Sequence, residues 1–217
     1  THCISSAASD VYKRQNYNDS ENIMGIGKRA KILNAKQQTM VLAYLENTRY
    51  PLRNEIMFLL SFKAGLRAKE ISQLTWSMVC GSERYISDSI NLPNNASKGK
   101  YSGRIIPIHK DLKKLLTDLK QENTNLSSYI ITTERDKKMF AQAIVNFFYL
   151  LYKGLNMDGC SSHSGRRTFI TQAAKMISQA GGTINDIRQL AGHSSLATTQ
   201  RYIEYNTEAH KKIIEMI

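Results

Sequence analysis

The sequence is poor in several features that would each define a class of protein. It holds three cysteines, Cys3, Cys80 and Cys160, which are odd in number and far apart. We therefore expect no disulfide framework, and a reducing cytosol fits this usage. The cysteines do not cluster with histidines at the spacing of a zinc finger, so we expect no structural metal. No run approaches the roughly 18 apolar residues of a membrane span.

Acidic residues are scarce as well. The 217 residues include 18 Asp and Glu against 30 Lys and Arg, which gives a formal net charge of +12. The hydrophobic content of 41% is sufficient for a folded core, in one large domain or two small ones. The charge favours nucleic acid as a partner, because neutralising phosphates releases counterions. An anionic membrane surface and a plain surplus of surface lysines remain alternatives at this stage.

The pattern of apolar positions divides the chain into two parts. Residues 1–30 show no apolar period, and we expect a disordered or non-native tail there. Residues 31–217 are predicted to form one mainly helical domain with a small antiparallel sheet, an α+β fold. Strands are expected within 78–92 and 98–108. Helices are expected from Asn34, from Pro51 to Gly65, near 70–76, and over 111–123, 139–155, 164–180, 184–190, 196–205 and 207–216.

Two segments place basic residues at chain turns. Arg67 follows Gly65 at the mouth of a helix, where backbone N–H groups and a guanidinium both favour phosphate. An ordinary surface pair with Glu70 is the alternative. Lys98 is placed at the tip of the predicted hairpin, with Lys100 close by. It could reach a DNA groove, or simply solubilise the turn.

The third segment holds His163 and Arg166, which share one face of a helix start because they are three residues apart. Arginine stays charged and is costly to bury, so a phosphate is a natural partner for the pair. The apolar positions that follow are predicted to form a buried stripe: Phe169, Ile170, Ala173 and Ile177.

The fourth segment runs from Gly192-His193 to Tyr202. In one continuous helix, His193 and Tyr202 would lie on opposite faces. A helix that ends at Gly192 and a new one that starts at Ser194 or Ser195 would remove this conflict. The ordinary alternative for Tyr202 is a half-buried aromatic side chain.

In this order, the four segments resemble the catalytic domain of the tyrosine recombinase, or phage integrase, family. The resemblance runs from about Lys31 to Glu204 and implies the fold of the DNA breaking-rejoining enzymes. Gly165 departs from the leucine that is common before the second arginine, and we expect looser packing there. The six active-site positions of the family carry the expected residue types here: Arg67, Lys98, His163, Arg166, His193 and Tyr202.

The resemblance also implies the roles of these residues. Tyr202 would attack the scissile phosphorus and form a 3′-phosphotyrosyl link, while Arg67 and Arg166 hold the non-bridging oxygens. Lys98 would protonate the 5′-oxygen that leaves.

The remaining residues of the predicted site have supporting roles. The resemblance implies that His163 assists Tyr202 as acid–base partner and that His193 donates a hydrogen bond to a phosphate oxygen. Glu70 would orient the site. Three further cations are candidates for contacts with the DNA backbone: Lys100, Arg104 and Arg167.

The resemblance therefore predicts a site-specific recombinase or integrase of a mobile element, which needs neither metal nor cofactor. Its partner would be double-stranded DNA, bound by a homotetramer, with no membrane and no small-molecule substrate. The tail helix 207–217 would dock on a neighbouring protomer, and packing on its own domain is the alternative. We expect a cytoplasmic, nucleoid-associated protein. Residues 1–30 cannot supply the core-binding domain that usually precedes this domain, so we expect that domain to be absent. A non-catalytic DNA-binding module and a type IB topoisomerase-like enzyme remain alternatives.

Overall fold

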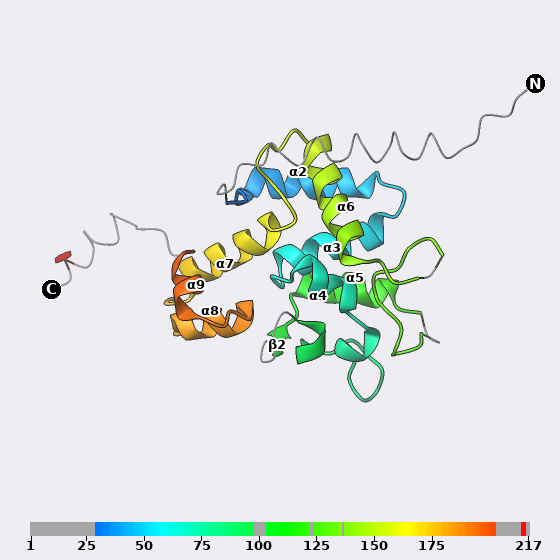
Figure 1. Ribbon diagram of the computed structural model, residues 1–217. Helices are drawn as coiled ribbons and strands as arrows, with labels where there is room; N and C mark the ends of the chain where they lie inside the picture. Colours follow the sequence, from blue (N-terminus) through cyan, green and yellow to red (C-terminus); the bar gives the residue numbers. More distant parts are fainter. Residues whose placement is uncertain (1–28, 98–102, 122–123, 136, 203–213, 216–217) are drawn as a thin grey trace, which may run out of the picture.

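The computed structural model describes residues 29–97, 103–121, 124–135, 137–202 and 214–215. The mainly helical α+β class is confirmed. The helices are α2 (Ala35–Glu46), α3 (Pro51–Phe62), α4 (Ala68–Gln73), α5 (Lys110–Leu119), α6 (Ala141–Gly154), α7 (Ser164–Met176), α8 (Ile184–Ala191) and α9 (Leu196–Gln200). Two 3₁₀ turns, η2 (Trp76–Met78) and η3 (Asn94–Ala96), and two strands, β1 (Ser89–Leu92) and β2 (Arg104–Pro107), accompany them. Helices α7, α8 and α9 lie together beside a body that contains α2 to α6 (Figure 1).

The predicted helix starts at Asn34 and Pro51 are confirmed, and each has a local cause. Asn34 caps α2, because its side chain accepts a hydrogen bond from Gln37 N while the Gln37 side chain accepts one from Asn34 N. Pro51 occupies the first turn of α3, where no backbone N–H is needed.

The predicted hairpin is confirmed but is shorter than the pattern indicated. Strands β1 and β2 pair antiparallel, with Ile90 opposite Ile106 and Leu92 opposite Arg104. The segment before β1 turns instead of extending, with Arg84 at a φ of 64°. The tip of the hairpin, residues 98–102, includes Lys98 and Lys100 and lies outside the described residues.

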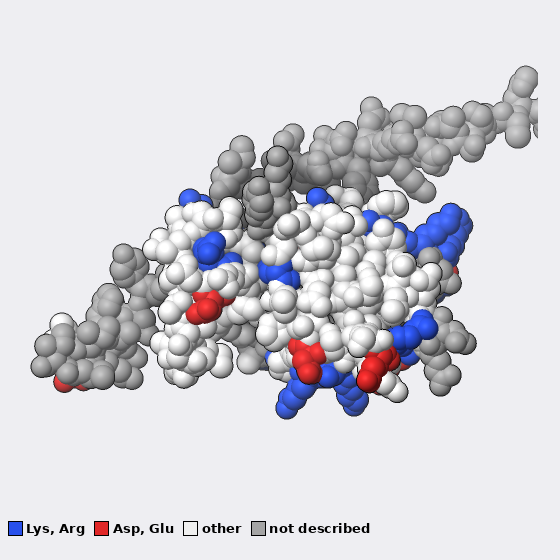
Figure 2. Space-filling model, turned by 90° about the horizontal axis from the view of Figure 1, so that it is seen from below, with Lys and Arg blue, Asp and Glu red and all other residues white. Residues whose placement is uncertain are grey.

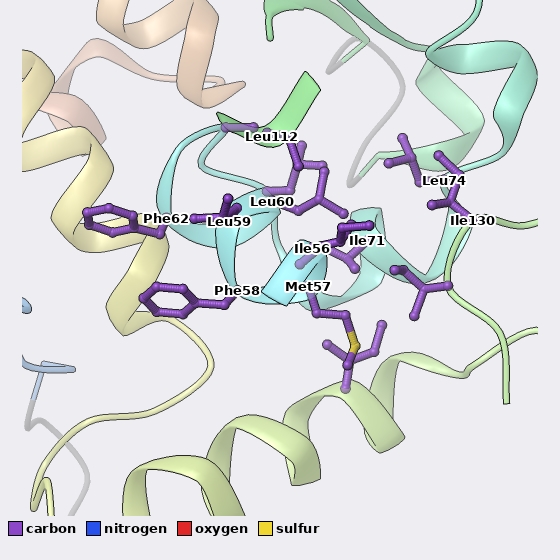
Figure 3. Packing of buried hydrophobic residues seen from close by; sticks show 14 of the residues in the cluster. Ile56, Met57, Phe58, Leu59, Leu60, Phe62, Ile71, Leu74, Leu112 and Ile130 are labelled. Carbon is purple, nitrogen blue, oxygen red and sulfur yellow. The ribbon is translucent and has the colours of Figure 1, made fainter. Parts of the chain in front are cut away.

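The main core is built around α3, whose residues from Ile56 to Leu60 are all buried (Figure 3). A helix that is apolar on every side has to be covered on every side. Leu74, which follows α4, and Leu112 of α5 pack into the same cluster. Phe58 and Phe62 stack with ring centroids 5.5 Å apart and project to one side of α3 (Figure 3).

A second, smaller core joins α7, α8 and Tyr202, which follows α9. The predicted stripe on α7 is confirmed: Ile170 is fully buried, and its three partners pack around it together with Ile187 and Ala191 of α8. This cluster is separate from the main core, although α7 itself also packs against α3.

Gly165 allows α7 to approach α3 closely, which corrects the expectation of looser packing. A Cβ at Gly165 would lie 2.6 Å from Ser61 Oγ and 3.3 Å from the backbone nitrogen of Phe62. A larger residue at position 165 would force α7 and α3 farther apart. The glycine therefore tightens the contact instead of loosening it.

The ends of several helices differ from the predictions. Helices α5, α7 and α9 end at Leu119, Met176 and Gln200, four or five residues before the predicted ends. Of the predicted tail helix, Ile214 and Glu215 are described and both are helical. The rest of that helix, and residues 1–28 of the predicted tail, lie outside the described residues.

Candidate active site

The structure brings five of the six predicted active-site residues to one pocket, while Lys98 lies outside the described residues. The pocket has a volume of about 440 Å³ and opens between α4, α7 and the α8–α9 turn. Its lining is Arg29, Ala30, Arg67, His163, Arg166, Arg167, His193, Thr198, Arg201 and Tyr202.

Arg67 is held at the start of α4 by Glu70. One Glu70 oxygen accepts a hydrogen bond from Arg67 N at 2.8 Å, and the other accepts one from the Arg67 guanidinium at 2.9 Å. The Glu70 side chain is fully buried, whereas that of Arg67 is 21% exposed. Arg67 thus lines the pocket while the buried Glu70 holds it from behind, and this geometry fits the orienting role predicted for Glu70.

The turn before Arg67 depends on Gly65. Its φ of +65° lies in the left-handed region that glycine adopts without strain. A Cβ there would collide with the ring of Phe169 on α7. The glycine therefore lets the chain bring Arg67 against α7.

Arg166 is a buried cation, with the residue 5% exposed. Its guanidinium donates hydrogen bonds to the carbonyl oxygens of Gly65 and Ala191. Burial, and next the nearby charge of Arg67, lower the pKa of Arg166 to about 9, so it stays protonated at neutral pH. His163 stands at the N-cap of the same helix and is exposed beside it.

His193 is buried against the cations and is neutral. Its pKa is lowered to about 4, first by burial and then by the charges of Arg166, Arg67 and Arg104. Nδ1 lies 2.9 Å from the Oγ1 of Thr199, which is fully buried. A neutral imidazole has one N–H, and the Thr199 hydroxyl can either donate to Nδ1 or accept from it.

Tyr202 lies next to His193. The two rings stack with centroids 5.6 Å apart and an interplanar angle of 23°. Tyr202 N also donates to Thr199 O at 3.0 Å. Thr199 thus contacts both residues, a link that the sequence analysis missed because no motif marks a threonine three residues before the tyrosine.

The predicted break between the two helices is confirmed. Gly192 ends α8 in the left-handed conformation with φ 60°, and Ser195 occupies the N-cap position of α9 without a side-chain capping bond. The turn reverses the chain, so His193 and Tyr202 reach the same pocket.

Arg104 is not at the surface, which corrects its expected place among the DNA-contacting cations. Its side chain is 5% exposed and forms a bidentate pair with Glu70, at 3.0 and 3.1 Å. It also donates from Nε to Leu190 O at 2.8 Å. The cause is strand alternation, because Arg104 shares the inward face of β2 with buried Ile106.

Arg167 lies in the pocket and also contacts the protein backbone. It lines the pocket, and its guanidinium donates to Ala30 O at 2.6 Å. Basic side chains are otherwise scattered over the face seen in Figure 2, with acidic ones among them. Surface charge alone does not locate the site; the convergence of arginines in the pocket does.

The described residues offer no group of three or more His, Cys, Asp and Glu side chains arranged to hold a metal ion. Within the same ranges, no helix has the length and apolar character needed to cross a membrane.

Comparison with known proteins relates the chain to phage integrases and tyrosine recombinases. The profile of the phage integrase family matches residues 31–209. Tyrosine recombinase XerA of Thermococcus kodakarensis is 26% identical over 192 residues, which are 85% of this chain and 62% of that protein. Tyrosine recombinase XerD of Vibrio vulnificus is 27% identical over 173 residues, 75% of this chain and 52% of that protein. The chain thus spans between about half and three fifths of these relatives.

Solved structures share the fold. An integrase of the Tn1549 transposon, in complex with a circular intermediate DNA, superposes with a TM-score of 0.68 at 16% identity, covering 95% of this chain and 75% of that one. The XerA recombinase crystal structure gives a TM-score of 0.61 at 22% identity, covering 89% and 65%. Because the family profile covers well over half of the sequence, the chain belongs to the phage integrase family.

Proposed function

We propose that this chain is the catalytic domain of a tyrosine-type site-specific DNA recombinase, which cleaves and rejoins DNA through a 3′-phosphotyrosyl intermediate. The observation that carries the proposal is the convergence of Arg67, Arg166, neutral His193 and Tyr202 in one pocket of about 440 Å³. Two cations and an N–H donor around a hydroxyl nucleophile are what a phosphodiester needs for displacement.

In the proposed cleavage step, Tyr202 Oη attacks the scissile phosphorus. A P–O bond to the tyrosine forms, the P–O5′ bond breaks, and a 5′-hydroxyl is released. Arg67 and Arg166 stabilise the charge on the non-bridging oxygens, and both are already held by hydrogen bonds before DNA arrives. His193, neutral in the pocket, donates its N–H to one of the same oxygens.

Two proton transfers complete the step. His163, exposed at the start of α7 and lining the pocket, receives the phenolic proton of Tyr202. Lys98, outside the described residues, gives a proton to the leaving 5′-oxygen. The phosphotyrosyl bond conserves the energy of the phosphodiester, so a 5′-hydroxyl from a second strand reverses the reaction without ATP, metal or cofactor.

The partner in this proposal is double-stranded DNA, brought together by four copies of the protein. The family membership and the transposon integrase among the structural neighbours support recombination of a mobile element. The basic lining beyond the reacting centre, Arg29 and Arg201, would contact phosphates beside the scissile one.

A nicked suicide duplex tests the proposal, because loss of the short strand after cleavage traps the covalent complex. We would incubate the chain with a pool of nicked duplexes with randomised centres and resolve adducts under denaturing conditions. The wild type should form an adduct, and analysis of its peptides should identify Tyr202 as the residue attached to DNA. Tyr202→Phe should form none, whereas Tyr149→Phe, which alters an exposed tyrosine of α6, should behave as wild type. Retained DNA binding without any wild-type adduct would identify a non-catalytic DNA-binding module, and relaxation of supercoiled DNA without strand exchange would identify a topoisomerase-like enzyme.

A further inference from the structure

The end of α8 is the meeting point of three arginines from three different elements. Consecutive carbonyl oxygens there each accept a guanidinium hydrogen bond. The pairs are Leu190 with Arg104 (2.8 Å), Ala191 with Arg166 (2.6 Å) and Gly192 with Arg67 (3.4 Å). The last carbonyls of a helix have no partner within it and carry partial negative charge, so they attract cations. His193 follows this turn directly.

Two of these arginines share one carboxylate. Glu70 is fully buried, and its two oxygens accept hydrogen bonds from both Arg104 and Arg67. Burial alone would raise the pKa of Glu70, but Arg104 and then Arg67 outweigh burial and lower it below the ordinary value. Glu70 therefore carries a full negative charge within contact distance of Arg67.

Arg104 balances that charge. Its bidentate pair engages both Glu70 oxygens, and with Arg67 and Arg166 it brings three positive charges to one negative charge. Without Arg104, the charge of Glu70 would fall on Arg67 alone, and the formal net charge of this group of four side chains would fall from about +2 to about +1.

Arg104 also shapes the turn that presents His193. A Cβ at Gly192 would lie 2.6 Å from Arg104 Nη1, so the guanidinium packs directly against the backbone at the end of α8. Arg104 is not among the residues that line the pocket. It acts on the site through Glu70 and through this turn, not by contact with DNA.

We propose that Arg104 is a positioning residue, which neutralises Glu70 and anchors the end of α8 so that Arg67 and Arg166 remain uncompensated cations for the scissile phosphate. The inference rests on the proposed function for its catalytic consequence. It differs from a DNA-contact role, which would require an exposed side chain.

The test compares the wild type with variants at Arg104 and Glu70. Arg104→Met removes the charge with little loss of volume, Arg104→Lys keeps the charge without the bidentate geometry, and Arg104→Met/Glu70→Gln removes both charges. Lys113→Met is the matched control, because it removes one exposed cation paired with Asp88 outside the site.

The first readout is single-turnover cleavage of the nicked duplex. Arg104→Met should cleave about tenfold to a hundredfold more slowly than wild type, and Arg104→Lys should lose less. The double variant should recover a substantial part of the rate because Glu70 no longer competes for Arg67. Lys113→Met should cleave at the wild-type rate. Equal rates in wild type and Arg104→Met, or a double variant no faster than Arg104→Met, would overturn the proposal.

The second readout needs no DNA and no activity. NMR titration of the His193 ring should show a higher pKa in Arg104→Met than in wild type, because a nearby positive charge has been removed. The double variant should return this pKa toward the wild-type value, and Lys113→Met should leave it unchanged. If these shifts appear but wild type forms no adduct, the recombinase function fails and the role of Arg104 stands. If the pKa of His193 is the same in all variants, Arg104 does not set the charge of the pocket.

Discussion

Acidification should destabilise the fold through His193. The residue is 7% exposed and faces three arginines, and its pKa is lowered from 6.5 to about 4. The folded protein therefore favours the neutral ring, whereas the unfolded chain binds a proton near pH 6.5. The stabilisation is fully present above pH 6.5 and is lost as the pH falls from about 6.5 to about 4.

The size of this loss follows from the two pKa values. The complete difference between 6.5 and about 4 corresponds to roughly 3 kcal/mol of unfolding free energy, and about 2 kcal/mol of it is already lost at pH 5. This is a substantial share of the stability of an ordinary domain, which is about 5–15 kcal/mol.

Urea unfolding of wild type and His193→Gln at pH 7, 6, 5 and 4 measures the effect. Glutamine keeps an N–H donor but has no proton to gain. Between pH 7 and pH 5, wild type should lose about 2 kcal/mol more than the variant. His109→Gln keeps His193 and should retain the steep loss of wild type. Parallel curves for wild type and His193→Gln down to pH 4 would refute the reasoning, because they would mean that the arginines do not act on a buried neutral ring.

Three further changes test other parts of the site. Thr199→Val should leave the buried Nδ1 of His193 without its partner, which lowers the unfolding free energy by about 1–3 kcal/mol in urea titrations, whereas Thr199→Ser should restore it. Gly165→Ala should cost about 1–3 kcal/mol by overpacking against Ser61, and Ser61→Gly in the same chain should relieve the loss. Lys98→Ala should slow cleavage of a normal duplex far more than that of a 5′-thio duplex; equal slowing on both would remove Lys98 as the general acid.

Most helix starts could be predicted because their causes are local. A capping box at Asn34 and a proline at the first turn of α3 are readable from neighbouring residues alone. The same holds for the left-handed glycine that ends α8. Helix ends were less accurate because apolar spacing does not mark them: α7 stops at Met176, while the next residue, Ile177, still packs against the second core.

The role of Arg104 was missed although a signal for it exists. In a strand, residues two apart point to the same face, and Arg104 is two residues before Ile106, which is 1% exposed. The alternation of β2 therefore already directed Arg104 inward. Its partner Glu70 lies 34 residues away in the chain, and only the folded structure shows that the two meet.

The arginines that form the pocket also help to hold α8 against the rest of the protein. The second core has few fully buried apolar residues, Ile170 of α7 with Ile187 and Ala191 of α8, so apolar burial supplies limited stabilisation to this unit. The close packing of α7 on α3 and the arginine hydrogen bonds to the end of α8 add to it. The carbonyl groups at this helix end thus contact Arg67 and Arg166 of the pocket as well as Arg104, and His193 follows them directly in the chain.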